Sequence, residues 1–178
     1  MDAMIKAIAK PELWLRIWHC LVLFALLACV SGLARAQDCT IATQPIAFGT
    51  YDPIETVTPL VSSTQLTVNC RKPNKVPFVA ALSTGSSGTY AQRHMESGGS
   101  QLPYNLYRDA GLTVVFGDGS AGTQSATCTT GIDGNGCTGS NPPGPDLRSI
   151  VPVFGRVPTN ADPVAGLHSD TITVTVTF

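Results

Sequence analysis

The stretch Asp170–Phe178, DTITVTVTF, carries the strongest structural signal in the chain. Ile172, Val174, Val176 and Phe178 alternate there with four threonines. Because side chains two residues apart point to the same face of a strand, the pattern predicts a β-strand with one apolar face. Residues 171–178 contain no charge, proline or bulge signal of the kind that normally protects an exposed sheet edge. Taken by itself, this strand is an unprotected sheet edge and an aggregation hazard.

Shorter stretches of the same kind recur toward the N-terminus, between clusters of Gly, Pro, Asn and Ser. No segment beyond residue 36 shows a sustained helical period of apolar residues. Many short strands separated by turn residues are typical of a β-sandwich. The predicted strands are 40–48, 64–69, 76–83, 104–107, 112–116, 150–157 and 171–178.

The first 36 residues are read as a signal peptide. Basic residues precede an apolar run at 17–30, and Ala34-Arg35-Ala36 has the small-x-small form of a signal peptidase site. The run is too short for a comfortable membrane span. An alternative is lipidation of Cys29, since Leu26-Leu27-Ala28-Cys29 loosely resembles a lipoprotein box. The leading prediction is export, with cleavage after Ala36 and one mature domain at 37–178.

The composition of this mature domain limits its partners. It holds seven Lys and Arg against ten Asp and Glu, a net charge of −3, and no basic patch stands out. Nucleic acid is thus an unfavourable partner, because binding its backbone requires clustered cations. Its length is sufficient for one domain with a core. We expect no membrane span in the mature chain.

Four cysteines remain after residue 36: Cys39, Cys70, Cys128 and Cys137. An even number in an exported chain indicates disulfides, and four cysteines allow three pairings. The closeness of Cys128 and Cys137 favours a bond between them, which leaves Cys39 for Cys70. The alternation in 64–70 places Cys70 on the same face as Leu66 and Val68, from which it can meet Cys39.

The segment Gly117–Asp146 interrupts the strand pattern with thirty residues rich in Gly, Ser, Thr and Pro. Loops of this length inside a domain are usually functional or disordered. The internal cysteine pair favours an elaborated surface loop. Asp118, Asp133 and Asn135 are its candidate contact residues. The same residues could supply oxygen ligands for calcium, but Asp-Gly and Asn-Gly turns explain them better.

The sequence offers no catalytic site and no cofactor motif. His168-Ser169-Asp170 contains the letters of a triad, but neighbours on an extended chain point in alternate directions and cannot converge. The two histidines after residue 36 lack metal-ligand spacing. Tyr104 and Tyr107 are three residues apart and so face opposite sides of a strand, which favours core packing, also for Phe116, over a sugar-binding platform. We expect neither enzyme activity nor a bound metal.

Several blocks of the sequence, taken in order, resemble the spore coat protein U domain family, which includes the subunits of archaic chaperone–usher pili. The blocks are FGTYD (48–52), VNC (68–70), LPYNLYRDA (102–110), VPVFGRVP (151–158) and AGLHSDTITVTVTF (165–178). They extend over nearly all of the mature chain. His168 stands where the family commonly has an aromatic residue.

The resemblance implies an all-β fold: an incomplete immunoglobulin-like β-sandwich that lacks its final strand and is completed by donor-strand addition. A periplasmic chaperone would fill the gap first, and a neighbouring pilin subunit would replace it after passage through the outer-membrane usher. If the chain ends at its penultimate strand, Ile172, Val174, Val176 and Phe178 line the groove that receives the donor. The Phe178 carboxylate would then be available to basic residues of the chaperone.

These implications give an expected function: a secreted structural subunit of a pilus (fimbrium), exported through the periplasm to the cell surface and serving adhesion and biofilm formation. Only Gln37 and Asp38 separate the predicted cleavage site from Cys39. That is too short for a donor extension and suggests a minor or terminal subunit. The alternatives are a secreted spore or cell coat protein that forms no fibre, or a carbohydrate-binding module that uses the 117–146 loop.

Overall fold

A computed structural model describes residues 38–178 of the chain. The predicted signal peptide, its cleavage site and the alternative lipidation at Cys29 lie outside these described residues. Within 38–178, no helix is long and apolar enough to cross a membrane.

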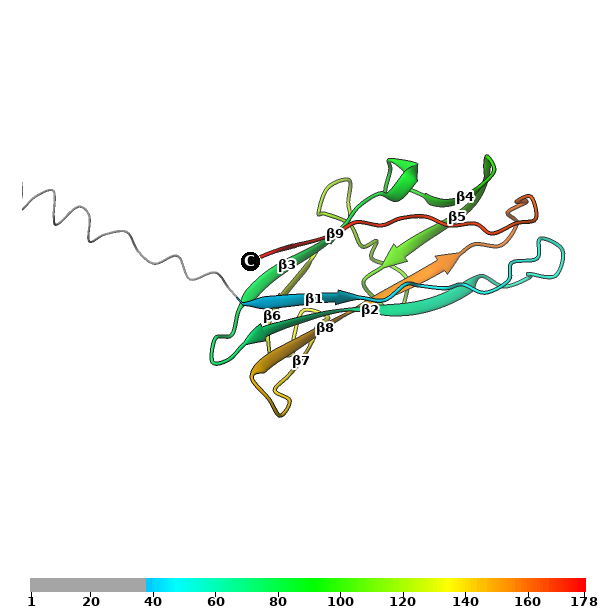
Figure 1. Ribbon diagram of the computed structural model, residues 1–178. Coiled ribbons are helices and arrows are strands. Elements are labelled where there is room, and N and C mark those ends of the chain that lie inside the picture. Colours follow the sequence, from blue (N-terminus) through cyan, green and yellow to red (C-terminus); the bar gives the residue numbers. More distant parts are fainter. Residues whose placement is uncertain (1–37) are drawn as a thin grey trace, which may run out of the picture. The chain divides into compact units, whose positions relative to one another are not determined.

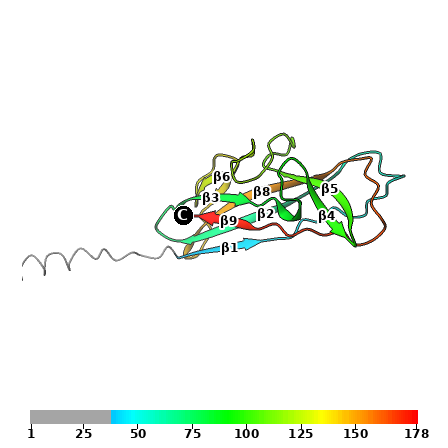
Figure 2. The same cartoon turned by 90° about the horizontal axis from the view of Figure 1, so that it is seen from above.

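Residues 38–178 form two antiparallel β-sheets packed face to face (Figures 1 and 2). The first sheet has the order β1-β2-β8-β5-β4, with β7 also paired to β8, and the second has the order β6-β3-β9. A 3₁₀ turn, η1, follows β3. The elements are β1 (Cys39–Thr43), β2 (Leu60–Arg71), β3 (Pro77–Leu82), η1 (Gly85–Ser87), β4 (Arg93–Ser97), β5 (Ser100–Tyr107), β6 (Ala126–Thr129), β7 (Thr138–Ser140), β8 (Asp146–Val157) and β9 (Val174–Thr177).

The long strands β2 and β8 form the centre of the first sheet. They pair over twelve residues each, from Leu60 opposite Val157 to Arg71 opposite Asp146. Both alternate between buried and partly exposed residues, so every second side chain points into the sandwich. The core between the sheets contains these side chains together with those of β3 and β5, among them Val68, Phe78, Leu106 and Val151.

The observed strands differ from the predicted ones at several boundaries, and the strand predicted at 171–178 is observed only as β9 at Val174–Thr177. The predicted strand at 40–48 ends at Thr43, whereas those at 64–69 and 104–107 extend to β2 and β5. Residues 112–116 form only isolated bridges. The strands β4, β6 and β7 were not predicted, because Arg93–Ser97 and the Thr- and Gly-rich segments lack alternating apolar residues.

The prediction that Gly117–Asp146 is a surface loop throughout is wrong in its middle part. Ala126–Thr129 is strand β6, which pairs with β3 in the second sheet and buries Ala126 and Cys128 completely or nearly so. Small side chains can fill a core position when the opposing strand supplies large ones, here Phe78. The loop is therefore partly an element of the sandwich.

Both disulfides are the ones that the sequence favoured. Cys39 is bonded to Cys70, its register partner across β1 and β2. Cys128 is bonded to Cys137 and closes the turn between β6 and β7. The first bond fixes the beginning of β1 to the sheet, and the second fixes the long segment to the core.

Candidate functional site

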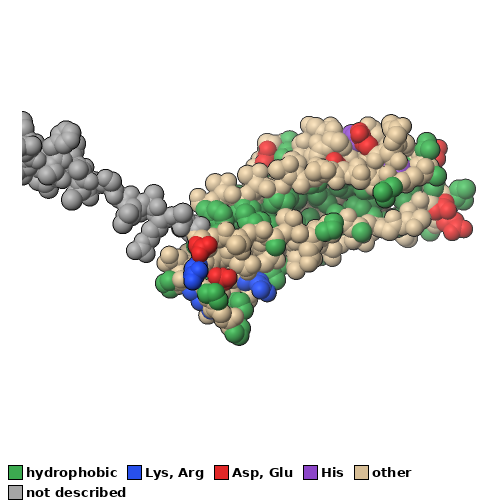
Figure 3. Space-filling view, viewed as in Figure 1, with side chains coloured by type: hydrophobic (Ala, Val, Ile, Leu, Met, Phe, Trp, Pro, Cys, Tyr) green, Lys and Arg blue, Asp and Glu red, His purple; other side chains and the backbone are tan. Residues whose placement is uncertain are grey.

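The edge strands β1 and β9 leave the sandwich open along one side. Within residues 38–178, β1 pairs with β2 only and β9 with β3 only, so the other edge of each lacks a strand partner. The two edges belong to different sheets and face each other across a groove. Figure 3 shows a band of apolar side chains along the bottom of this groove.

The groove has two walls and an apolar floor. One wall is the segment Thr43–Phe48, which continues β1, and the other is the segment His168–Val174, which leads into β9. The hollow between these walls has a volume of about 540 Å³. Its floor includes four core residues from β2, β3, β5 and β8: Leu66, Leu82, Leu106 and Val153.

The C-terminal segment turns its apolar side chains inward, and two of them, Ile172 and Val174, line the hollow. Ile172, Val174 and Val176 are half-buried and pack against the core. Phe178 remains 49% exposed, with its ring centroid 6.3 Å from that of Phe78. The intervening threonines are exposed on the opposite face. The β9 edge is therefore apolar on the side where the sandwich is open.

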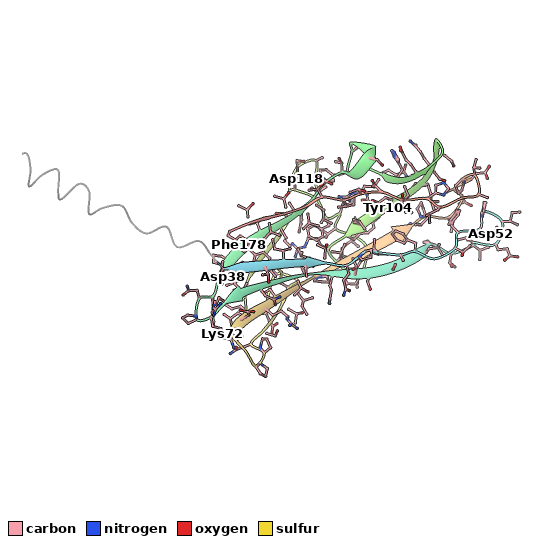
Figure 4. All side chains as sticks on the ribbon, in the orientation of Figure 1. Asp38, Asp52, Lys72, Tyr104, Asp118 and Phe178 are labelled. Carbon is pink, nitrogen blue, oxygen red and sulfur yellow. A yellow bond between two sulfur atoms is a disulfide. The ribbon has the colours of Figure 1, made fainter. Side chains whose placement is uncertain are left out.

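Asp170 fixes the segment that leads into β9, which is the second wall of the groove. The Tyr104 hydroxyl donates a 2.6 Å hydrogen bond to Oδ2 of Asp170, and the backbone N–H groups of Ser86 and Thr171 donate to Oδ1 at 2.9 and 2.7 Å. Burial opposes ionisation of this carboxyl, but the three donors outweigh it and the pKa of Asp170 is lowered. Burial, together with the bond to Asp170, raises the pKa of Tyr104. Figure 4 shows Tyr104 in the middle of the fold.

A buried arginine lies behind this contact. Arg93 of β4 donates to the Ser83 carbonyl, to Oδ1 of Asn105 at 2.7 Å and to the Phe116 carbonyl at 2.8 Å. Its guanidinium lies 5.1 Å from the ring centroid of Tyr90. Burial lowers the pKa of Arg93. The side chain thus joins β4, β5 and the residue that follows β3.

The first wall is fixed by aromatic and aliphatic packing on a glycine. Ile46 and Phe48 occupy the space over Gly155 of β8, where an added Cβ would lie 2.6 Å from each. The ring of Phe48 also lies 5.8 Å from that of Tyr104. The segment that follows β1 therefore packs against the core. It forms one fixed wall of the groove, opposite the segment that leads into β9.

The remaining predicted site residues serve turns. Asp118 accepts hydrogen bonds from the Ser120 N–H and hydroxyl, Asp133 accepts one from the Gly139 N–H, and the Asn135 amide donates to the Thr127 carbonyl. Among the described residues, no group of His, Cys, Asp and Glu could hold a metal ion. Asp133 and Asn135 share the connection between β6 and β7, whereas Asp118 lies in the separate turn that precedes β6.

The residues His168, Ser169 and Asp170 do not form a catalytic triad, because the side chains of His168 and Asp170 contact different partners. His168 contacts the Gly166 carbonyl and the Ser100 hydroxyl, whereas Asp170 contacts Tyr104 and Ser86. Sequence reasoning assigned Tyr104 to the core but missed its bond to Asp170, and it missed Arg93 entirely. An arginine in a weakly apolar stretch looks like a surface residue, so no sequence signal marked it.

Comparisons with known proteins bear on this architecture. A family model described as Spore Coat Protein U domain matches residues 25–175. No curated protein is similar enough to match the chain. Fifteen solved chains match. One is from the crystal structure of the CsuC–CsuE chaperone–tip adhesion subunit pre-assembly complex of archaic chaperone-usher Csu pili of Acinetobacter baumannii.

The likeness to that solved chain concerns the fold. It has 24% sequence identity and a TM-score of 0.50, and it covers 80% of this chain. This chain spans only 40% of the length of the other. Together with the antiparallel sheets, the likeness confirms the predicted all-β, immunoglobulin-like fold class.

Proposed function

The chain belongs to the Spore Coat Protein U domain family, and from this premise we propose that it is an exported structural subunit of a chaperone-usher pilus or a related surface structure. It works by accepting a β-strand from another protein in the groove between β1 and β9. A periplasmic chaperone supplies that strand first, and a neighbouring subunit supplies it after passage through the usher. No catalytic step is part of this proposal.

The single observation that carries the proposal is the open groove between two unpaired sheet edges. Each edge exposes backbone N–H and C=O groups that can continue a ladder, and the floor between them is apolar. Strand addition satisfies such backbone groups, while alternate side chains of the added strand fill apolar pockets. An open groove of this form is thus chemically suited to an extended, alternating segment.

The energies support the need for a partner. Full burial of a large apolar side chain is worth roughly 1.5–3 kcal/mol, and three such side chains on the β9 wall are only half-buried. Typical domains are stable by about 5–15 kcal/mol in total. Covering the groove therefore adds a large fraction of the stability, and an uncovered edge is prone to aggregation.

A co-expression experiment tests this function. The chain is expressed for export with and without a periplasmic chaperone of the chaperone-usher class, and the soluble complex of the two is quantified. Val176→Asp places a charge on the inward, partly buried face of β9, whereas Thr175→Asp places the same charge on the exposed face of the same strand. We expect Val176→Asp to reduce the complex at least tenfold and Thr175→Asp to leave it nearly unchanged. Equal yields with and without the chaperone would contradict the proposal.

The surface role follows from assembly. We propose that the assembled structure reaches the cell surface and contributes to adhesion and biofilm formation. A strain that lacks this chain should lose surface fibres or coat material in electron micrographs and form less biofilm on a plate. Restoring the Val176→Asp variant should not rescue either property.

A further inference from the structure

The outer face of the first sheet, which points away from the second sheet, presents two aromatic side chains on neighbouring strands. Tyr107 of β5 and Phe154 of β8 are register partners, and both are partly exposed. Their neighbours Leu106 and Gly155 are buried and also oppose each other, so the alternation of the strands directs Tyr107 and Phe154 outward. Side chains directly opposite each other on a ladder have Cβ atoms about 5 Å apart. The two rings therefore belong to one surface.

This pair differs from the aromatic pair that the sequence suggested. Tyr104 and Tyr107 lie three residues apart on β5, and Tyr104 is buried whereas Tyr107 is partly exposed. The second outward ring comes instead from the neighbouring strand β8. Only the register of β5 against β8 reveals this pair, because Tyr107 and Phe154 are far apart in the sequence.

A small hollow lies beside Tyr107 at the end of β8. It has a volume of about 160 Å³, and its lining includes Gln92, Tyr107 and Arg156. All its lining residues lie within 38–178 and none of them is Asp or Glu, so Arg156 makes the hollow positively charged. Within the described residues, the side chains of Gln92, Tyr107 and Arg156 make no hydrogen bond. Donors available to a ligand thus meet at a hollow that suits a single anionic group, because pockets for whole ligands measure roughly 300–1,000 Å³.

The strands around the rings carry neutral polar side chains and a second cation. On the same face of β2, Ser63, Gln65 and Thr67 lie opposite positions 154, 152 and 150 of β8. Arg148 lies on this face at the other end of β8, about 26 Å from Arg156 along the strand. The outward residues of β8 between the two arginines, and those of β2 opposite them, include no Asp or Glu. This part of the face is free of negative charge, although residues 37–178 carry a net charge of −3.

We propose that this face binds a linear acidic polysaccharide. The apolar C–H face of a sugar ring packs on Tyr107 and Phe154, whose rings supply the apolar area. The fork of the Arg156 guanidinium matches a sugar carboxylate, which it binds through two parallel hydrogen bonds. The hydroxyl and amide groups on β2 suit the hydroxyl groups along the polysaccharide. The site lies on the opposite face of the sheet from the strand-accepting groove, so this inference goes beyond the proposed function and does not depend on it.

Calorimetric titration of the exported protein with an oligomer of galacturonic acid tests the site. The same oligomer with methyl-esterified carboxyl groups is the control ligand, because it keeps the sugar rings and loses the charge. We expect the esterified oligomer to bind at least tenfold more weakly than the acidic one. Arg156→Gln and Tyr107→Ser should each weaken binding of the acidic oligomer at least tenfold, and Arg156→Lys, which keeps the charge but not the fork, about threefold. Lys75→Gln removes an exposed cation in the turn after β2 and should leave binding unchanged.

Several results would overturn the polysaccharide site. They are the absence of binding by the acidic oligomer, equal binding of the esterified oligomer, and unchanged binding by Arg156→Gln. Tighter binding of single-stranded DNA with the same number of charges would assign the face to nucleic acid and also overturn the proposal. Tyr107→Phe keeps the ring and should retain binding within about threefold, which separates loss of the ring from loss of the fold. Arg156→Gln should still form the chaperone complex, so failure of this site is distinguishable from failure of the proposed function.

Discussion

The Tyr104 hydroxyl and the Asp170 carboxylate form a 2.6 Å hydrogen bond between positions 66 residues apart in the sequence. Tyr104 belongs to β5 of the first sheet, and Asp170 lies in the segment that leads into β9 of the second. The bond therefore joins the two sheets beside the open groove. It fixes the wall on which an added strand would be built.

Removing this hydroxyl should destabilise the fold and loosen the groove. For Tyr104→Phe we expect a loss of about 1.5–3 kcal/mol in the free energy of unfolding, the usual value of a hydrogen bond to a charged group. Tyr107→Phe is the matched control, because no side-chain hydrogen bond of Tyr107 occurs among residues 38–178. Urea denaturation of the two variants measures the difference. Equal losses would show that the bond contributes nothing specific.

The carboxylate also makes stability depend on pH. Burial opposes ionisation of Asp170, but the hydrogen bonds from Tyr104, Ser86 and Thr171 prevail, so its folded pKa lies below the unfolded value of about 3.9. The contribution of the ionised Asp170 side chain to the free energy of unfolding is therefore full above about pH 4. It is lost as the pH falls through the pKa of Asp170 in the folded protein.

The variant Asp170→Asn tests this sign. It should be less stable than the wild type at neutral pH, and its free energy of unfolding should fall less on acidification from about pH 6 to about pH 3. Asp162→Asn, which replaces an exposed carboxylate in the loop between β8 and β9, is the matched control for loss of one negative charge. Parallel pH profiles for wild type and Asp170→Asn would refute the assignment.

The buried Arg93 should be intolerant even of lysine. A lysine ammonium cannot reach the Ser83 carbonyl, the Asn105 side chain and the Phe116 carbonyl in the planar arrangement of a guanidinium. We expect Arg93→Lys to cost about 3 kcal/mol, because buried acceptors lose their donors. Arg156→Lys, on the partly exposed side of β8, should change stability by less than about 0.5 kcal/mol. Thermal unfolding of both proteins provides the comparison.

The two disulfides should differ in their effect on the groove. In the chain-entropy model, the Cys39–Cys70 bond contributes about 3.7 kcal/mol and the Cys128–Cys137 bond about 2.7 kcal/mol. Because only the first holds the edge strand β1, Cys39→Ser with Cys70→Ser should also speed amide hydrogen exchange in β1 and weaken chaperone capture. Cys128→Ser with Cys137→Ser should leave β1 exchange unchanged. A similar change in β1 for both pairs would contradict this role.

The sequence predicted the parts of the fold that alternation encodes. Residue spacing within short segments predicts the apolar faces of β2, β8 and the C-terminal strand. Spacing along the chain also favours the two observed disulfide pairs. Strand β6 escaped prediction because Ala126 and Cys128 are small, and their burial depends on Phe78 in a distant strand. Propensity carries no information about such a partner.

The candidate site likewise contains residues that the sequence predicts and contacts that it does not. The pattern together with the family resemblance assigns Ile172, Val174, Val176 and Phe178 to the groove, and of these Ile172 and Val174 line the hollow. The bond of Tyr104 to Asp170 and the three bonds of Arg93 could not be predicted, since they join residues whose proximity arises only from the sheet order. Polar contacts between distant segments leave no periodic trace in a sequence.

The most direct test of the open groove is to fill it within the same chain. Beyond Phe178 we would add a short Gly-Asn turn and an alternating strand, Ile-Thr-Val-Thr-Val-Thr-Val, which can return antiparallel to β9. The control carries the same extension with Asn in place of each apolar residue. Burial of several apolar side chains should add about 3 kcal/mol, which corresponds to an increase in Tm of about 10 °C over the control, with slower amide exchange along β1 and β9. Equal Tm values, and unchanged exchange at both edges, would contradict the account.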